Sequence, residues 1–256
     1  MPSPTNGPRA RTIGGADGCR DDVKLSIIVP VYNEEQTIGT VVERVRAVDL
    51  GAIEKEIIVA NDGSDDGTER AIDAVPAGGP TPLRVVHSPI NLGKGAAIRL
   101  GLKYATGDVI LIQDADLELD PNEYGALLAP ILRGEQVVYG SRFLRTAKGI
   151  SRRTRLANRL LTWLTNLLYF SALTDMETGY KVFRRDVLQR VRLRAVGFDF
   201  EPELTAKLLL AGYRIVEVPI SYNPRRRDEG KKIRWVDGMD AAYVLVKHRL
   251  VGDVRS

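Results

Sequence analysis

The feature that most constrains the fold of this chain is a repeated order of short apolar run, polar loop and segment with helical spacing. The apolar runs are rich in Val and Ile and lie at 25–31, 56–60, 83–86 and 109–113. Runs of this kind, separated by helices, are typical of parallel strands that are buried on both faces of a sheet. The sequence therefore predicts an α/β fold, with a mostly parallel sheet flanked by helices.

Polar side chains follow the predicted strands at the point where each strand ends. Ligands of open α/β sheets bind beyond the carboxyl ends of the strands. We therefore expect a binding site built from the residues after the four runs, which are Asn33 and Glu34, Asp62, Asn91 and Lys94, and Asp114 and Asp116.

The strongest single pattern is the alternation of Asp114, Asp116 and Glu118 directly after the fourth run. In extended backbone, side chains two residues apart project to the same side. Carboxylates placed in this way suit Mg²⁺ or Mn²⁺, whose other ligands are waters and substrate phosphate oxygens. A solvated acidic loop before a helix near Pro121 is the alternative, but the polar groups at the other strand ends favour the metal site.

Composition and missing motifs exclude several classes of protein. A single cysteine, Cys19, excludes a disulfide framework and a Cys-cluster zinc site, and the presence of only two histidines argues against a His-rich metal site. Segment 91–95 contains Gly-Lys-Gly but not the P-loop pattern, and no Gly-x-Gly-x-x-Gly follows the first strand. No apolar run reaches the roughly 18 residues of a membrane-spanning helix. We expect a cytoplasmic chain that is soluble or peripheral to a membrane.

Five blocks together resemble the family 2 inverting glycosyltransferases, which have the Rossmann-like GT-A fold. Within that family, the chain is most similar to the soluble catalytic domain of dolichyl- or polyprenyl-phosphate sugar (mannose or glucose) synthases. The resemblance implies a nucleotide-sugar donor and a divalent cation, Mg²⁺ or Mn²⁺. The blocks, in the family's order, are PVYNEE at 30–35, NDGSDDGT at 61–68, NLGKG at 91–95, DAD at 114–116 and GSR at 140–142.

The resemblance also implies roles for individual residues. Asp114, Asp116 and Glu118 would hold the metal, and Asp116 and Arg142 would be catalytic, the latter at a phosphate of the reacting centre. Two positions depart from the family's pattern, because Asn61 stands where Asp is frequent and Glu118 where Gln is frequent. Contacts to the nucleotide sugar are implied for Pro30, Tyr32, Glu34, Asp62, Lys94, Asp114 and Ala115.

The second half of the chain is expected to bind the acceptor. Arg152 and Arg153 precede a run at 160–170 that is rich in Leu, Trp, Tyr and Phe. Such a segment fits a membrane interface that admits a lipid phosphate, and it equally fits an amphipathic helix that covers the sheet. Both interpretations hold if the membrane contact and the contact with the sheet use different faces of one helix.

Four further segments extend the acceptor half. Segments 175–181 and 198–201 resemble family blocks near the acceptor, although Glu201 also suits the start of a helix. Loop 225–232 (RRRDEGKK) resembles the basic loop of the polyprenyl-phosphate branch, with a solvated charge run as the alternative. A final amphipathic helix is predicted at 237–246. The residues implied for the acceptor phosphate are Arg142, Arg152, Arg153, Lys231 and Lys232.

These implications divide the 256-residue chain into one domain and two tails. Residues 1–22 lack apolar periodicity and are expected to be a disordered tail. Residues 23–248 are expected to form a single GT-A domain, with a donor-nucleotide half at 23–142 and an acceptor half at 143–248. Residues 249–256 form the second tail.

The leading hypothesis is an enzyme that moves a hexose from a GDP-mannose or UDP-glucose type of donor to polyprenyl phosphate, by single displacement with inversion, at the cytoplasmic membrane face. A phosphate monoester is mostly dianionic at neutral pH and needs no protein base. The same fold acting on a soluble or protein hydroxyl is the nearer alternative. The net charge of +4 also allows a nucleic-acid-binding module, but the acidic strand ends favour an enzyme without nucleic acid as partner.

Overall fold

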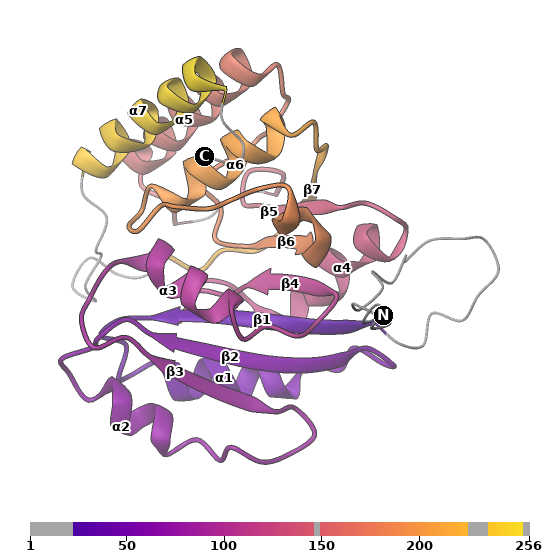
Figure 1. Cartoon of the computed structure of the whole chain (residues 1–256), viewed down its shortest axis with the longest axis vertical. Coiled ribbons are helices and arrows are strands. Elements are labelled where there is room, and N and C mark those ends of the chain that lie inside the picture. Colours follow the sequence, from indigo (N-terminus) through magenta and orange to yellow (C-terminus); the bar gives the residue numbers. More distant parts are fainter. Residues whose placement is uncertain (1–22, 146–148, 225–234, 253–256) are drawn as a thin grey trace, which may run out of the picture.

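The computed structural model describes residues 23–145, 149–224 and 235–252, and the structural statements below concern these residues. Within them, seven strands form one sheet in the order β3-β2-β1-β4-β6-β5-β7 (Figure 1). Neighbouring strands are parallel except at β6, which runs antiparallel to β4 and β5. The predicted α/β fold with a mostly parallel sheet is confirmed. The strands are β1 Lys24–Val31, β2 Glu54–Asn61, β3 Leu83–His87, β4 Val109–Ile112, β5 Val137–Ser141, β6 Lys181–Arg184 and β7 Ile215–Pro219.

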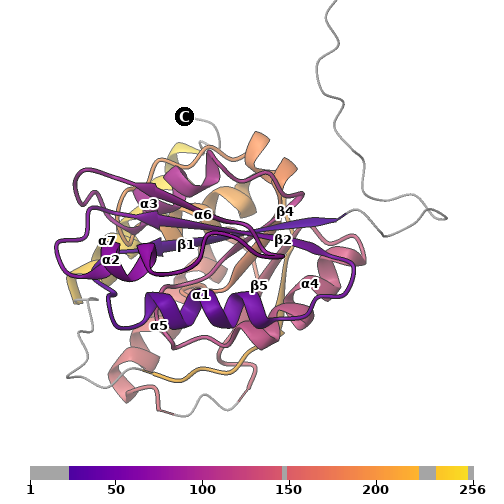
Figure 2. The ribbon, with the colours of Figure 1, turned by 90° about the horizontal axis from the view of Figure 1, so that it is seen from below.

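Helices cover both faces of this sheet. One hydrophobic cluster joins the sheet to α1 and α4, and a second joins its opposite face to α3 and α6, as Figure 2 shows for α1 and α3. Two 3₁₀ turns, η1 Pro121–Glu123 and η2 Arg185–Gln189, connect elements. The helices are α1 Ile38–Ala47, α2 Thr68–Asp73, α3 Lys94–Leu102, α4 Tyr124–Leu132, α5 Arg152–Tyr169, α6 Phe200–Leu210 and α7 Trp235–Val251.

The central strand β1 shows why the apolar runs become buried strands. Ile27 and Val29 point into the cluster with α1, whereas Ile28 points into the cluster with α3. Successive side chains of a strand alternate between faces, so a strand covered on both sides must be apolar at every position. The continuous run at 25–31 meets that requirement.

The strand order reverses at β1, and this reversal positions the site. The chain adds β2 and β3 on one side of β1 and then crosses to β4 on the other side. Ligands of such sheets bind in the crevice at this switch point, outside the carboxyl ends of the strands. The loops after β1, β2 and β4, which carry most of the predicted donor residues, therefore meet at one edge.

Helices α5 and α7 form an outer layer beyond α6 (Figure 1). Leu161, Leu164 and Leu168 of α5 pack with Leu245 of α7 and Ala206 of α6. The alternative in which this segment covers the sheet is therefore wrong, because the buried face of α5 packs on α6 and α7 and not on the strands. Helix α7 is also longer than the predicted 237–246. No helix of the described ranges is long and apolar enough to cross a bilayer.

Candidate functional site

The loops after β1 and β2 are joined into one ledge by side chains. Asn33 donates from Nδ2 to Asp65 Oδ1 at 2.6 Å, and its own Oδ1 accepts from the Asp65 backbone N–H at 3.1 Å. Asn33 has a φ of 51°, a left-handed conformation that Asn tolerates better than most residues. The Glu34 N–H donates to Thr68 Oγ1 at 2.7 Å. The loop with Tyr32 and Glu34 thus has a fixed position over the end of β2.

Asn61 and Asp62, at the end of β2, hold neighbouring loops in place. Both carboxylate oxygens of Asp62 accept backbone N–H groups, from Leu92 at 3.1 Å and Gly93 at 2.6 Å. Burial raises the pKa of Asp62 above its ordinary value. Asn61 Oδ1 accepts from both Ser64 N–H and Ser64 Oγ, while its Nδ2 lies 3.2 Å from His87 Nδ1. An amide suits this position because it offers an acceptor on one side and N–H groups on the other.

Lys94, the first residue of α3, is held between two carboxylates. Its Nζ lies 2.8 Å from Asp114 Oδ1 and 2.7 Å from Glu201 Oε1. Burial alone would lower the pKa of Lys94, but these two carboxylates raise it above the ordinary value. Lys94 was predicted to contact the nucleotide sugar, and the structure adds a partner, Glu201, that sequence reasoning assigned only to the acceptor side or to a helix start.

Asp114 is enclosed by protein groups on two sides. Lys94 binds Oδ1, and a Cβ placed on Gly179 would lie 2.2 Å from Oδ2, so the backbone at Gly179 packs directly on the carboxylate. Burial would raise the pKa of Asp114, but Lys94, Lys181 and Arg142 together keep it below the ordinary value. Asp114 is therefore ionised and rigidly placed at the end of β4.

Asp116 and Glu118 continue from Asp114 along the loop. The Glu118 N–H donates to Asp116 Oδ1 at 3.1 Å, and Glu118 Oε2 accepts from the Tyr222 hydroxyl at 2.8 Å. Across the part of the chain that the structure describes, no three His, Cys, Asp or Glu side chains form a ready-made metal cluster. Because Mg²⁺ is usually bound by one or two carboxylates together with substrate phosphates, the oxygen donors present still suit such an ion.

Arg142, after β5, is oriented by an acidic partner that the sequence did not indicate. Its Nε and Nη2 each donate to an oxygen of Asp175 at 2.7 Å, and its backbone N–H donates to the same carboxylate. The guanidinium also lies over the rings of Phe143 and Tyr222, at 5.8 and 5.3 Å from their centroids. Burial would lower the pKa of Arg142, but Asp175 raises it. Arg142 is thus a fixed, permanently charged cation.

The loop after Asp175 brings two more titratable groups into this region. Lys181 is buried, donates from Nζ to the carbonyl oxygens of Met176 and Thr178, and lies 4.7 Å from the Tyr139 ring centroid. Burial lowers the pKa of Lys181 to about 8. Burial and the nearby Glu201 raise the pKa of Glu177 to about 7. In the sequence this segment is marked only by its resemblance to a family block, which gives neither residue a role.

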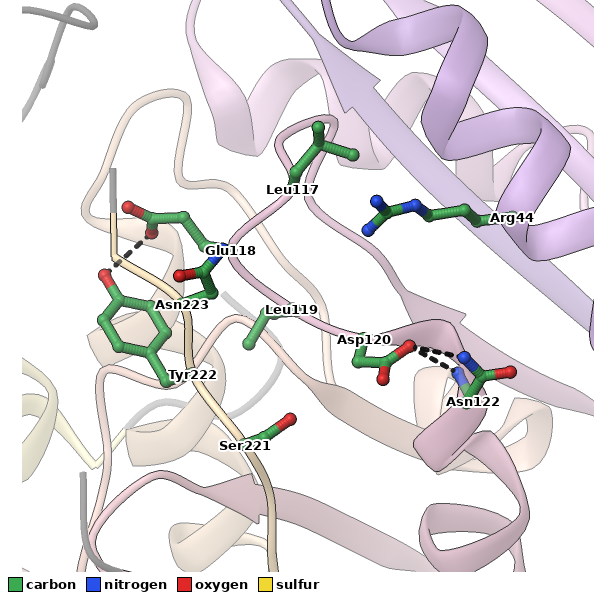
Figure 3. Close-up of a pocket in the computed structure, with 9 residues that line it drawn as sticks. All are labelled: Arg44, Leu117, Glu118, Leu119, Asp120, Asn122, Ser221, Tyr222 and Asn223. Atoms are coloured by element: carbon green, nitrogen blue, oxygen red, sulfur yellow. Dashed lines mark hydrogen bonds between the residues drawn. The ribbon is translucent and has the colours of Figure 1, made fainter. Parts of the chain in front are cut away.

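A cavity of about 370 Å³ lies beside Glu118 (Figure 3). In Figure 3, Glu118 and Tyr222 point toward each other from separate segments, and Arg44 reaches toward the cavity from α1. Tyr222 therefore lines the cavity and also lies under the guanidinium of Arg142. The lining of the cavity is Arg44, Leu117, Glu118, Leu119, Asp120, Asn122, Ser221, Tyr222 and Asn223.

The remaining predicted residues are placed as follows. Pro30 and Ala115 are buried at the ends of β1 and β4, and Tyr32 and Glu34 are half-buried on the ledge. Arg152 and Arg153 are exposed in the first turn of α5, a separate element from the strand-end loops. Lys231 and Lys232 lie outside the described residues. The structure therefore brings Lys94 together with Asp114, and it links Glu118 through Tyr222 to Arg142.

Comparisons with known proteins show what the chain as a whole is similar to. The model of Glycosyl transferase family 2 matches residues 26–192. Polyprenol monophosphomannose synthase of Mycolicibacterium smegmatis is 30% identical over 214 residues, which cover 80% of each chain. Undecaprenyl-phosphate mannosyltransferase of Micrococcus luteus is 29% identical over 219 residues, which cover 82% of this chain and 87% of that protein. This chain spans only 37% and 59% of two longer relatives.

A solved structure supports the fold independently. Glucosyl-3-phosphoglycerate synthase from Mycobacterium tuberculosis, in complex with Mn²⁺, UDP-glucose and phosphoglyceric acid, has a TM-score of 0.68 and 25% sequence identity to this chain. The match covers 89% of this chain and 80% of that one.

Proposed function

We propose, since the chain belongs to Glycosyl transferase family 2 and is a glycosyltransferase, that it transfers a hexose from a nucleotide sugar to a polyprenyl or dolichyl phosphate. The donor is of the GDP-mannose or UDP-glucose type, and the reaction is a metal-dependent single displacement with inversion. The observation that carries this proposal is the position of the acidic loop 114–118 at the switch point of the sheet, joined through Tyr222 to the fixed cation Arg142.

The donor half of the site would hold the leaving group. Asp116, with Asp114 and Glu118, would bind Mg²⁺ or Mn²⁺, which neutralises charge on the departing diphosphate. Lys94 keeps Asp114 ionised and in place through their 2.8 Å contact. The ledge at Tyr32 and Glu34, and the loop held by Asp62, would surround the nucleoside.

The acceptor half would hold the lipid phosphate. Arg142 uses Nε and Nη2 to bind Asp175, so its orientation is set before any substrate arrives. A fixed cation can bind a phosphate without the cost of ordering its own side chain. Because the acceptor is already an anion, no side chain has to remove a proton from it. Arg152, Arg153, Lys231 and Lys232 are proposed to add charge on this side.

The outer helices supply a surface for a peripheral contact with the cytoplasmic face of a membrane. Large apolar side chains of α5, and of Phe170 directly after it, are exposed in a stripe, with Trp163 62% and Phe170 86% exposed. On α7, Leu250 is 81% exposed. An amphipathic helix with apolar side chains on one face and arginines near its end binds anionic lipid surfaces. The stripe consists of Leu156, Leu160, Trp163, Leu167 and Phe170.

A soluble acceptor is the second candidate. The structural neighbour with a TM-score of 0.68 holds phosphoglyceric acid, a small water-soluble phosphate compound. Arg142 and the cavity beside Glu118 would suit a phosphate of that kind as well.

Transfer of labelled sugar into an organic phase tests whether the acceptor is a lipid phosphate or a soluble compound. Purified protein is incubated with Mn²⁺ or Mg²⁺, each of several nucleotide sugars and a short polyprenyl phosphate. The proposal expects one donor to label the lipid with inverted anomeric configuration. Transfer only to water-soluble acceptors, a trapped glycosyl-enzyme or retained configuration would contradict it. Nucleic acid should neither bind tightly nor compete.

A further inference from the structure

The segment from Asp175 to Gly179 links the two charged parts of the proposed site. At its start, Asp175 binds Arg142 through two hydrogen bonds of 2.7 Å. At its end, the backbone of Gly179 packs on the carboxylate of Asp114. Glu177 is the middle residue of this segment, and the charge of Arg142 acts on its carboxyl group.

Glu177 has a carboxylate oxygen that the protein leaves unsatisfied. Its Oε1 is buried and has no hydrogen-bond partner in the ranges that the structure describes. An unpaired buried acceptor loses its hydration without compensation, and most such groups in native proteins have a partner. The oxygen is therefore suited to a donor that arrives with a ligand.

The charges around Glu177 restrict what that donor can be. Lys181 of β6 and Arg142 after β5 are positive, which disfavours a metal ion at this point. Glu201 of α6 and Asp175 on the same segment are negative, as Glu177 itself is when ionised, which disfavours a phosphate. A hydroxyl group is uncharged and donates a hydrogen bond, so it fits both conditions.

We propose that Glu177 determines sugar specificity by accepting a hydrogen bond from a hydroxyl group of the transferred hexose. This inference rests on the proposed function, because there the hexose lies between the donor diphosphate at Asp116 and the acceptor phosphate at Arg142. It goes further by assigning one residue to the recognition of the sugar rather than the nucleotide or the lipid.

The ionisation of Glu177 gives the contact a pH signature. With a pKa of about 7, Glu177 changes from mostly neutral to mostly ionised between pH 6 and pH 8. A hydroxyl donates a stronger hydrogen bond to a carboxylate than to a neutral acid. The hexose-dependent part of donor affinity should therefore increase over this interval.

Calorimetric titration in the presence of Mn²⁺ tests this contact. GDP is compared with GDP-mannose and UDP with UDP-glucose, for the wild type and for Glu177→Ala and Glu177→Gln. Glu177→Ala should weaken binding of the nucleotide hexose about tenfold and leave the diphosphate unchanged. Glu177→Gln keeps an oxygen acceptor, so it should recover part of the affinity and lose the pH dependence. Glu43→Gln, on the exposed face of α1, is the control.

The outcomes separate this inference from the proposed function. Equal weakening of both ligands, or no weakening in a folded Glu177→Ala variant, overturns the role of Glu177. Donor analogues that each lack one hydroxyl identify the contact, because the relevant analogue should bind wild type and Glu177→Ala alike. Sugar transfer to a hydroxyl compound in place of prenyl phosphate contradicts the acceptor assignment and leaves Glu177 in its role. A folded wild type that binds no nucleotide hexose contradicts both.

Discussion

The strand-end loops and the outer surface of α5 and α7 are built in opposite ways. At the strand ends, buried carboxylates such as Asp62 and Asp175 are bonded to backbone N–H groups or to a guanidinium. On the outer helices, large apolar side chains such as Trp163 and Phe170 are exposed to solvent. Under the proposed function this difference has a reason: the reacting groups need one fixed arrangement, whereas a contact with a membrane surface tolerates many side-chain arrangements.

The largest expected effect is at the strand ends, where the carboxylate nearest the proposed metal is removed. Asp116→Ala should lower the transfer rate about a thousandfold, because the leaving diphosphate loses its main source of charge compensation. Transfer rates and circular dichroism measure the effect on turnover and on folding. Asp73→Ala, an exposed change on α2, should keep the wild-type rate. Near-normal turnover in Asp116→Ala would remove the proposed metal site.

A second test concerns stability at the strand ends. Lys94→Met leaves the half-buried Asp114 and the buried Glu201 without their shared cation, which should reduce the free energy of unfolding by about 3 kcal/mol. Denaturant unfolding measures the change. Adding Glu201→Gln should restore part of the loss, since one unpaired charge is then removed. Arg159→Met, on the exposed surface of α5, should change stability by less than about 0.5 kcal/mol.

A third test uses the pH dependence of the free energy of unfolding, which the buried Glu177 should influence. The pKa of Glu177 is raised from 4.5 to about 7, so its contribution to stability is fully present below pH 4.5 and is lost as the pH rises through 7. Glu177→Gln does not titrate there and should be more stable than the wild type by about 1 to 3 kcal/mol at pH 7.5.

Thermal and denaturant unfolding from pH 4.5 to 7.5 measure this difference between Glu177→Gln and the wild type. The upper limit matters because Lys181, whose pKa is lowered to about 8, gives stability that rises with pH above that value. Parallel stability curves for the two proteins would show that the carboxyl group is not perturbed.

The smallest expected effect lies on the outer helices. Trp163→Glu should weaken binding to anionic vesicles about tenfold, because an interfacial apolar side chain is replaced by a charge of the same sign as the lipid. Its melting temperature should stay within a few degrees, since Trp163 is 62% exposed. Co-sedimentation with phosphatidylglycerol vesicles and a melting curve give the two readouts. Unchanged sedimentation would assign the stripe to another role.

The sequence predicted the fold where a residue's neighbours in sequence decide its structure. The apolar run 25–31 becomes β1 almost without change of boundary, because a strand covered on both faces needs that pattern. The partner of α5 was not predictable in the same way. Apolar side chains lie on both of its faces, and the pattern alone does not distinguish packing on a sheet from packing on α6 and α7.

For the candidate site, too, the sequence predicted which residues lie at the strand ends but not their partners from distant parts of the chain. The residues after the strands were predicted to converge, and Lys94 does contact Asp114. The partners Glu201 and Asp175 come from distant parts of the chain, and sequence spacing carries no information about such pairs. Family resemblance marked their segments but assigned them no contact. Asn61, noted as a departure from the family, is explained only by its bonds to Ser64 and its position beside His87.

The start of α3 packs closely against segment 195–197, which belongs to the other half of the chain. The Gly95 and Ala96 N–H groups donate to the carbonyl oxygens of Gly197 and Val196, at 3.2 and 3.0 Å. A Cβ on Gly95 would lie 2.6 Å from the Ala195 carbonyl oxygen. A chimaera that takes one half of this enzyme from a relative should therefore fold only if the start of α3 and segment 195–197 come from the same parent.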